Sequence, residues 1–257
     1  MTLSYVVSGF AVGLLVGLTG VGGGSLMTPL LTLLFGISPT VAVGTDLAFA
    51  SITKSAGTFA HRFRGTVHWD IVRHLCVGAL PAAVLTTFTL KYFGTLDAQI
   101  GQFIRYAIAG SVLLTVVAII FRTRMQAWIQ QRPERQLHGD ALRNATILSG
   151  AILGILVTIS SIGAGAIGAT LLVLLYPKLT PAEVAGTDIA YAVPLTAIAA
   201  FGHWWLGSIN WELLGMLLLG SVPGITLGSL AAKAVPEKLL RTLLAMTLTG
   251  VAVKLVF

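Results

Sequence analysis

Long apolar segments separated by short polar turns make up most of this chain. The pattern predicts helices at 4–20, 25–36, 40–60, 71–92, 98–121, 143–160, 167–176, 182–205, 211–233 and 237–256. Most of these approach the roughly 20 residues that a membrane-spanning helix needs. The alternation of polar and apolar residues that is typical of a membrane β-barrel is absent from the sequence. We therefore expect an all-α, polytopic membrane protein.

Two of the predicted helices, 25–36 and 167–176, are too short to span a bilayer, and each follows a glycine-rich break. The first break is Gly20-Val21-Gly22-Gly23-Gly24-Ser25, and the second runs from Ser160 to Gly168 and includes Gly163 and Gly165. A proline turn ends each short helix, at Pro39 and at Pro181. Each break with its flanking helices is thus predicted to form a glycine-broken helix pair.

The chain also repeats itself at an offset of 142 residues (188 − 46). Pro39, Gly44-Thr45-Asp46, Phe59, His61, Gly65, Trp69, Gly78 and Pro81 recur as Pro181, Gly186-Thr187-Asp188, Phe201, His203, Gly207, Trp211, Gly220 and Pro223. Internal duplication in a membrane chain is typical of transporters built from two related halves. We therefore predict a single transporter domain over 1–257, with a first repeat at 1–121, a cytoplasmic loop at 122–142 and a second repeat at 143–257.

Composition agrees with a membrane protein and excludes several other classes. Hydrophobic residues make up 56% of the chain and charged residues only 10%, against roughly 25% charged residues in soluble domains. The net charge of +7 comes from basic residues gathered near helix ends, which is typical of cytoplasmic anchors rather than of nucleic-acid binding. The one cysteine, Cys76, lies in an apolar helix and is interpreted as a small hydrophobic residue.

The distribution of basic residues favours one topology over another. If each broken pair crosses the membrane once, basic residues lie on both sides and the repeats are parallel. If each pair folds back to its starting side, leaving three further spanning helices per half, only Lys91 and Lys254 lie opposite the other basic residues at helix ends. The positive-inside rule favours the second arrangement. Its odd number of crossings makes the two halves inverted repeats.

The glycine-rich breaks are candidates for an anion site. Unwound backbone within the membrane is tolerated where it is buried in protein or lines a cavity, and a helix that starts there presents unpaired N–H groups and the positive end of its dipole. We predict substrate contacts from Gly22, Gly23, Gly24, Ser25, Gly163, Gly165 and Gly168. The alternative is close helix packing through small residues, which is common in membranes.

Charged residues inside apolar helices supply further candidates. An aspartate in such a helix costs about 2.5–3.5 kcal/mol on insertion scales, so Asp46 and Asp188 need a partner or a function. They can accept backbone N–H groups of a broken segment, bind a coupling cation, take a proton, or serve only as helix-start caps. The adjacent Thr45 and Thr187 are candidate substrate ligands. Lys54 either supplies a counter-charge for an anion or pairs with Asp46, and its repeat equivalent is Thr196 (54 + 142).

Two histidines at equivalent helix ends, His61 and His203, complete the candidate set. Beside Trp69 and Trp211 they fit anchoring at the membrane–water interface, with gating or proton relay as the alternative. The spacing of the histidines does not match a metal site, and no cysteine accompanies them, so we expect no metal. The glycine run lacks the Gly-Lys-[Ser/Thr] ending of a P-loop, and no cofactor is expected.

At these residues the chain resembles the sulfite exporter TauE/SafE family of membrane transporters. The resemblance rests on Gly20-Val21-Gly22-Gly23-Gly24 with Pro29, on Pro39 with Gly44-Thr45-Asp46, on the stretch from Lys54 to Gly65 with Trp69, and on Gly186-Thr187-Asp188. It implies a prokaryotic multi-pass protein that moves small sulfur-containing anions such as sulfite or sulfonates. The second half departs from the glycine-rich pattern, with Ala164 and Ala166 in place of Gly22 and Gly24.

Together these observations predict a secondary transporter that exports a small sulfur-containing anion across the cytoplasmic membrane. Expected partners are the anionic substrate, a coupling proton or cation and the lipid bilayer, and a homo-oligomer is compatible with the sequence. An uncoupled channel with the same fold is the first alternative. An intramembrane enzyme is a weaker one, because no nucleophile motif is present. A purely structural membrane partner gives no reason for duplicated intramembrane aspartates.

Overall fold

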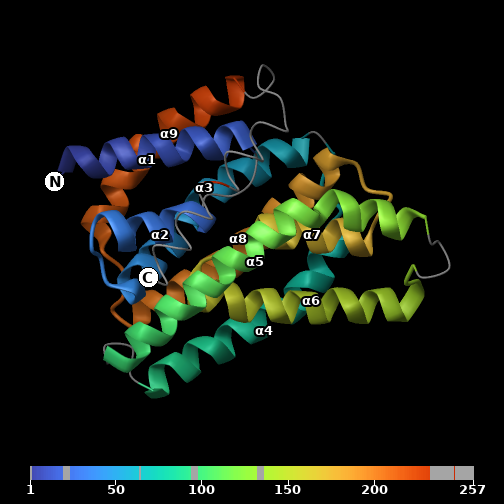
Figure 1. The fold of residues 1–257 in the computed structure, drawn as a ribbon, viewed down its shortest axis with the longest axis horizontal. Helices are drawn as coiled ribbons and strands as arrows, with labels where there is room; N and C mark the ends of the chain where they lie inside the picture. Colours follow the sequence, from blue (N-terminus) through green and yellow to red (C-terminus); the bar gives the residue numbers. More distant parts are fainter. Residues whose placement is uncertain are drawn as a thin grey trace.

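The computed structural model describes residues 2–19, 24–63, 65–93, 98–131, 136–231 and 246 (Figure 1). The elements are α1 (Thr2–Thr19), α2 (Gly24–Leu34), α3 (Pro39–Phe63), α4 (Trp69–Phe93), α5 (Ala98–Gln130), α6 (Gly139–Ser160), α7 (Ala166–Leu175), α8 (Pro181–Trp205) and α9 (Trp211–Ala231). These helices confirm the predicted all-α class and the two short helices that follow the breaks. The predicted helix at 237–256 lies outside the described residues, apart from Met246.

Several of these helices are suited to a bilayer. Among the described residues, five are long and apolar enough to span: Trp69–Phe93, Gly101–Arg122, Gly139–Ser160, Pro181–Trp205 and Trp211–Gly228. Large apolar side chains on them point outwards, including Leu85 at 67% exposure and Leu219 at 72%. Such exposure is costly in water and favourable against lipid tails. The structure is therefore consistent with a polytopic membrane protein.

The predicted loop at 122–142 is partly wrong, because α5 continues to Gln130 and α6 already begins at Gly139. Residues 122–130 include good helix formers such as Arg, Gln, Met and Ala, and no proline occurs before Pro133. Local propensity therefore extends the helix past the apolar segment, which ends near Arg122. Polarity correctly marked the end of the candidate membrane span, but not the end of the helix.

Equivalent local signals delimit the two central helices, α3 and α8. Gly65 and Gly207, which are repeat equivalents (65 + 142), lie just beyond them in left-handed conformations, with φ of 65° and 70°. Glycine adopts this conformation without a steric penalty. At its start, α8 carries a capping box: Thr180 Oγ1 accepts from Glu183 N, and Glu183 Oε2 accepts from Thr180 N at 2.8 Å.

The most extensive helix contacts join helices from different halves of the chain. α1 packs along α9, and α6 packs along α4, so the first helix of each half lies against the other half (Figure 1). Glycines allow these backbones to touch. The Leu217 and Ser221 carbonyls occupy the space that Cβ atoms on Gly9 and Gly13 would need.

The same contact recurs between α6 and α4, where the Leu75 and Ala79 carbonyls lie against Gly150 and Gly154. Leu217 and Ser221 follow Leu75 and Ala79 by 142 residues (217 − 75), whereas Gly150 follows Gly9 by 141 (150 − 9). The order of these contacts shows that the two helices run in the same direction within each pair. The duplication is therefore visible in the packing as well as in the sequence.

The two central helices, α3 and α8, pack against each other in opposite directions. Gly44, near the start of α3, lies against His203 near the end of α8 and against Ser208 just beyond it. At the other end, the Thr187 hydroxyl near the start of α8 accepts a hydrogen bond from the N–H of His68, which follows α3. The core of apolar side chains surrounds this pair and includes Phe49, Tyr191 and Leu195.

We predict that Gly220→Ala destabilises the protein, whereas Gly215→Ala does not. Both glycines lie in α9, so the gain in helix propensity, up to about 1 kcal/mol, is the same for both. A Cβ atom at 220 would meet the Val6 carbonyl, whereas nothing lies within 4 Å of one at 215. Overpacking at 220 costs about 1–3 kcal/mol. Thermal unfolding in detergent, followed by tryptophan fluorescence, should give a lower Tm for Gly220→Ala alone; equal Tm values would contradict the packing.

Candidate functional site

The central helices carry three charged side chains into the interior of the protein. Asp46 and Lys54 lie on α3 and Asp188 lies on α8, with exposures of 0%, 6% and 4%. Each belongs to an otherwise small and apolar helix segment. Buried charges are costly unless they are paired or hydrogen-bonded, so their surroundings indicate what each one does.

The break between α6 and α7 has a backbone shape that depends on glycine. Ser161 is left-handed with φ 58°, and Gly163 and Gly165 have φ of 130° and 152°. The chain reverses here, and α7 starts with Gly168 N donating to Gly163 O at 2.9 Å and Ala169 N donating to Gly165 O at 2.8 Å. The N–H groups of Ala166 and Ile167 donate to no acceptor among the described residues. Two backbone donors thus remain at the start of α7.

Lys54 joins the first half to this break. Its Nζ donates to the Ala164 carbonyl at 2.5 Å, across 110 positions of sequence. Ala164 lies between Gly163 and Gly165, so the ammonium group binds the unwound backbone itself. Within the described residues no ion pair of 4 Å or less joins Lys54 to an acid, and the direct pairing with Asp46 considered from the sequence is absent. Its repeat equivalent, Thr196, bonds to the Ala192 carbonyl of its own helix.

Asp46 lies between elements of both halves. Thr28 Oγ1, from α2, donates to Asp46 Oδ2 at 2.6 Å. The hydroxyl of Ser161, from the second-half break, lies beside the same carboxyl group. Asp46 Oδ1 and Ser161 Oγ are both buried without a hydrogen-bond partner in the part of the chain that the structure describes. Asp46 is seven residues into α3, so the proposed role as a helix-start cap does not apply.

Asp188 has a different environment, over the first turn of α7. Its Oδ1 and the Tyr191 hydroxyl both lie where a Cβ atom on Gly168 would be, and neither has a hydrogen-bond partner among the described residues. Gly168 therefore lets two polar side chains of α8 approach the α7 backbone closely. The site around the break thus combines one ammonium group, two carboxyl groups, the three hydroxyl groups of Thr28, Ser161 and Tyr191, and two backbone donors.

Thr45 and Thr187 link the halves in matching ways. Thr45 Oγ1 accepts from Asn210 N, and Thr187 Oγ1 accepts from His68 N, both at 3.1 Å. Asn210 is the repeat equivalent of His68 (68 + 142), so these are two copies of one contact. Only the His68 copy adds an ion pair, from Nε2 to Glu183 Oε1 at 3.0 Å. The predicted substrate ligands Thr45 and Thr187 hold interhelical loops in this conformation.

The predicted histidine pair is only partly described. His203 is fully buried, and its Nε2 lies 2.9 Å from the Thr158 carbonyl of α6. Anchoring at the membrane–water interface is therefore wrong for His203, because helix packing encloses the side chain. Trp69 and Trp211, at 51% and 59% exposure, remain available for that role. The His61 side chain lies outside the described part of the structure.

The first-half glycine break is also largely outside the described residues. Gly22 and Gly23 are not described, while Gly24 and Ser25 form the first turn of α2 without a described side-chain environment. Sequence reasoning missed Thr28, Ser161 and Tyr191. Tyr191 had a detectable signal, because it adds a hydroxyl where the first repeat has Phe49 (49 + 142).

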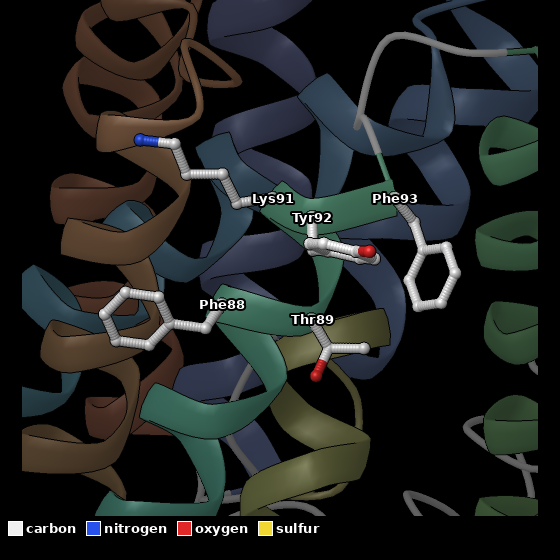
Figure 2. A pocket seen from close by; sticks show the side chains of 5 residues that line it. All are labelled: Phe88, Thr89, Lys91, Tyr92 and Phe93. Atoms are coloured by element: carbon white, nitrogen blue, oxygen red, sulfur yellow. The ribbon is translucent and has the colours of Figure 1, made fainter.

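A hollow on the protein surface, with a volume of about 490 Å³, lies away from these residues. It is lined by Phe88, Thr89, Lys91, Tyr92 and Phe93 at the end of α4. Phe88 and Lys91 extend to one side of α4 and Phe93 to the other (Figure 2). Lys91 Nζ lies 3.1 Å from the centre of the Trp205 ring. Aromatic rings with a lysine at helix ends are typical of a membrane–water interface, and we assign the hollow to that belt.

Comparison with known proteins agrees with this architecture. The family model of the sulfite exporter TauE/SafE matches residues 5–255. The probable membrane transporter protein YjnA of Bacillus subtilis is 36% identical over 229 residues, which cover 89% of each chain. The probable membrane transporter protein YdhB of B. subtilis is 27% identical, over 93% of each chain. A probable membrane transporter protein of Xylella fastidiosa is 28% identical, over 97% of this chain and 93% of the relative. No solved structure matches the chain.

The match spans both glycine-broken pairs and both central helices, as well as the buried charges that they carry. The chain belongs to the sulfite exporter TauE/SafE family of membrane transporters.

Proposed function

We propose that the protein is a secondary transporter that moves a small sulfur-containing anion, sulfite or an organosulfonate, across the cytoplasmic membrane. Net movement is outward when the anion is more concentrated in the cytoplasm. The proposal of substrate class draws on the family, whose name refers to sulfite export. The site chemistry comes from the break between α6 and α7.

The observation that carries the proposal is the contact between Lys54 and the break. The ammonium group lies at Ala164, beside the start of α7, where the Ala166 and Ile167 N–H groups have no described acceptor. A helix start with free N–H groups and an adjacent cation suits an oxyanion. Lys54 is buried and lies near the middle of α3, which supports a site deep within the bundle.

The buried carboxyl groups give the site a means of coupling. With Asp46 and Asp188 ionised, Lys54 interacts with two carboxylates, of which only Asp188 also interacts with Arg122, so that the charge of Asp46 opposes binding of an anion in a medium of low dielectric constant. Binding of a proton or another cation at an aspartate removes this repulsion. We therefore propose that Asp46 or Asp188 holds the coupling ion while the anion occupies the break.

Helix directions support an inverted arrangement of the repeats. α3 and its repeat equivalent α8 run antiparallel, and the Thr45–Asn210 and Thr187–His68 contacts lie at opposite ends of this pair. A two-fold axis perpendicular to membrane-spanning helices lies in the membrane plane. The arrangement supports a topology in which the loop at 65–68 lies on the cytoplasmic side, together with Arg62, Arg73, Arg122 and Arg143, as the positive-inside rule favours.

Topology can be tested with two equivalent exposed acids, Asp70 and Glu212 (70 + 142), in a Cys76→Ser background. Asp70→Cys and Glu212→Cys should react with a membrane-impermeant maleimide from opposite sides. Asp70→Cys should be labelled from the cytoplasm and Glu212→Cys from outside. Labelling of both variants from the same side would show parallel repeats.

Transport itself should be measured in sealed proteoliposomes. We expect labelled sulfite or methanesulfonate to exchange against the same unlabelled anion inside, at rates well above those of protein-free vesicles. Exchange that is stimulated by internal substrate distinguishes a transporter from a channel, which gives flux without this stimulation. Rates equal to those of empty vesicles for every sulfur anion would refute the proposed function.

Lys54→Met should reduce the initial exchange rate by roughly ten-fold or more. It removes the buried cation and a charge-assisted hydrogen bond worth about 1.5–3 kcal/mol, where about 1.4 kcal/mol corresponds to a factor of ten. Lys91→Met is the matched control, since Lys91 lies on Trp205 at the end of α4 and away from the break. The assignment of Lys54 fails if both variants transport at wild-type rates and are equally well folded.

A further inference from the structure

We propose that the Asp46 carboxyl group and the Ser161 hydroxyl group form the binding site of a coupling proton, which travels with the anion. This inference rests on the proposed transport function and identifies both the ion and its site. Asp46 belongs to the first half and Ser161 to the second, so the site exists only where the two halves meet.

The two unpaired atoms of this site, Asp46 Oδ1 and Ser161 Oγ, are both oxygens, and one added proton can be shared between them in a hydrogen bond. Asp46 Oδ2 already accepts from Thr28 Oγ1, whereas Asp46 Oδ1 and Ser161 Oγ are buried without a partner. An ionised carboxylate at full burial leaves Oδ1 charged and unsatisfied. A proton on Oδ1 neutralises this charge and supplies a donor, and a small displacement of the Ser161 side chain brings its Oγ into position to accept from it. The proton comes from water on one side of the membrane and returns to water on the other.

The residues around the pair connect its protonation to the anion site. Ser161 is the left-handed residue with which the break begins, and Lys54 binds the same break three residues later, at Ala164. Among the described residues, the charged group that interacts with Asp46 is Lys54, which also interacts with Asp188 of α8, and Asp188 interacts in turn with Arg122. An anion at the start of α7 adds negative charge to this cluster and therefore favours protonation of Asp46.

Conformational change provides a route for proton release. Ser161 belongs to the α6–α7 pair, whereas Thr28 and Asp46 belong to α2 and α3. Any movement of the α6–α7 pair against α3 separates Ser161 from Asp46 and opens the carboxyl group to water. Proton and anion then leave together, so that transport of a monoanion is electroneutral. The net direction follows the sum of the anion and pH gradients.

The test separates proton coupling from transport. Proteoliposomes with wild-type protein should exchange labelled sulfite at equal pH, and should accumulate it above equilibrium when the outside is more acidic. Asp46→Asn removes the group that takes the proton, so we expect the ratio of pH-driven accumulation to exchange at equal pH to fall at least ten-fold. Ser161→Ala should shift the pH dependence of exchange, whereas Ser111→Ala, a change at a buried serine of α5, should behave as wild type.

The outcomes are distinguishable. Exchange without pH-driven accumulation in the wild type, or accumulation by Asp46→Asn, overturns the proton site and leaves the transport function in place. If Asp46→Asn is inactive in both assays, Ser161→Ala decides, and an unchanged pH profile overturns the site. Absence of exchange by the wild type with every sulfur anion overturns the transport function and, with it, this inference.

Discussion

Direct backbone contact between helices of opposite halves is the constraint on which the rest of the structure depends. α1 lies against α9 and α6 lies against α4 through glycines, whose missing side chains let carbonyl groups approach. In lipid there is little hydrophobic driving force between helices, so close packing of this kind holds them together. Each broken pair is thereby placed against the other half, and both halves contribute to every part of the bundle centre.

The packing of helices from one half against the other half explains how a costly polar cluster persists in an apolar interior. Asp46, Lys54 and Asp188 lie on the central helices, and the break of the second half passes alongside them. Unwound backbone needs partners within the membrane, and Lys54 supplies one to the Ala164 carbonyl. The break in turn gives the buried ammonium group an acceptor. Polar atoms of Asp46, Ser161, Asp188 and Tyr191 stay buried without a hydrogen-bond partner among the described residues, beside the break that Lys54 binds.

Much of the fold could be predicted, because the information is local. Apolar length identified the helices, and glycine and proline located the breaks, as the short α2 and α7 confirm. Polarity failed at the end of α5, where helix propensity carries the chain to Gln130. The interfacial interpretation of His203 failed for a related reason, since its position near a helix end says nothing about which neighbour covers it.

By itself, the sequence determined the membrane class, the duplication, the two breaks and the charged residues that need a function, because each depends on composition or spacing along the chain. Only the tertiary structure decided their partners. Lys54 meets Ala164 rather than Asp46, Ser161 faces Asp46, and Thr45 and Thr187 bind the loops of the opposite half. These contacts join residues more than 100 positions apart, through helices exchanged between halves. No local pattern encodes such partners, since they follow from how the glycine-lined backbones pack in space.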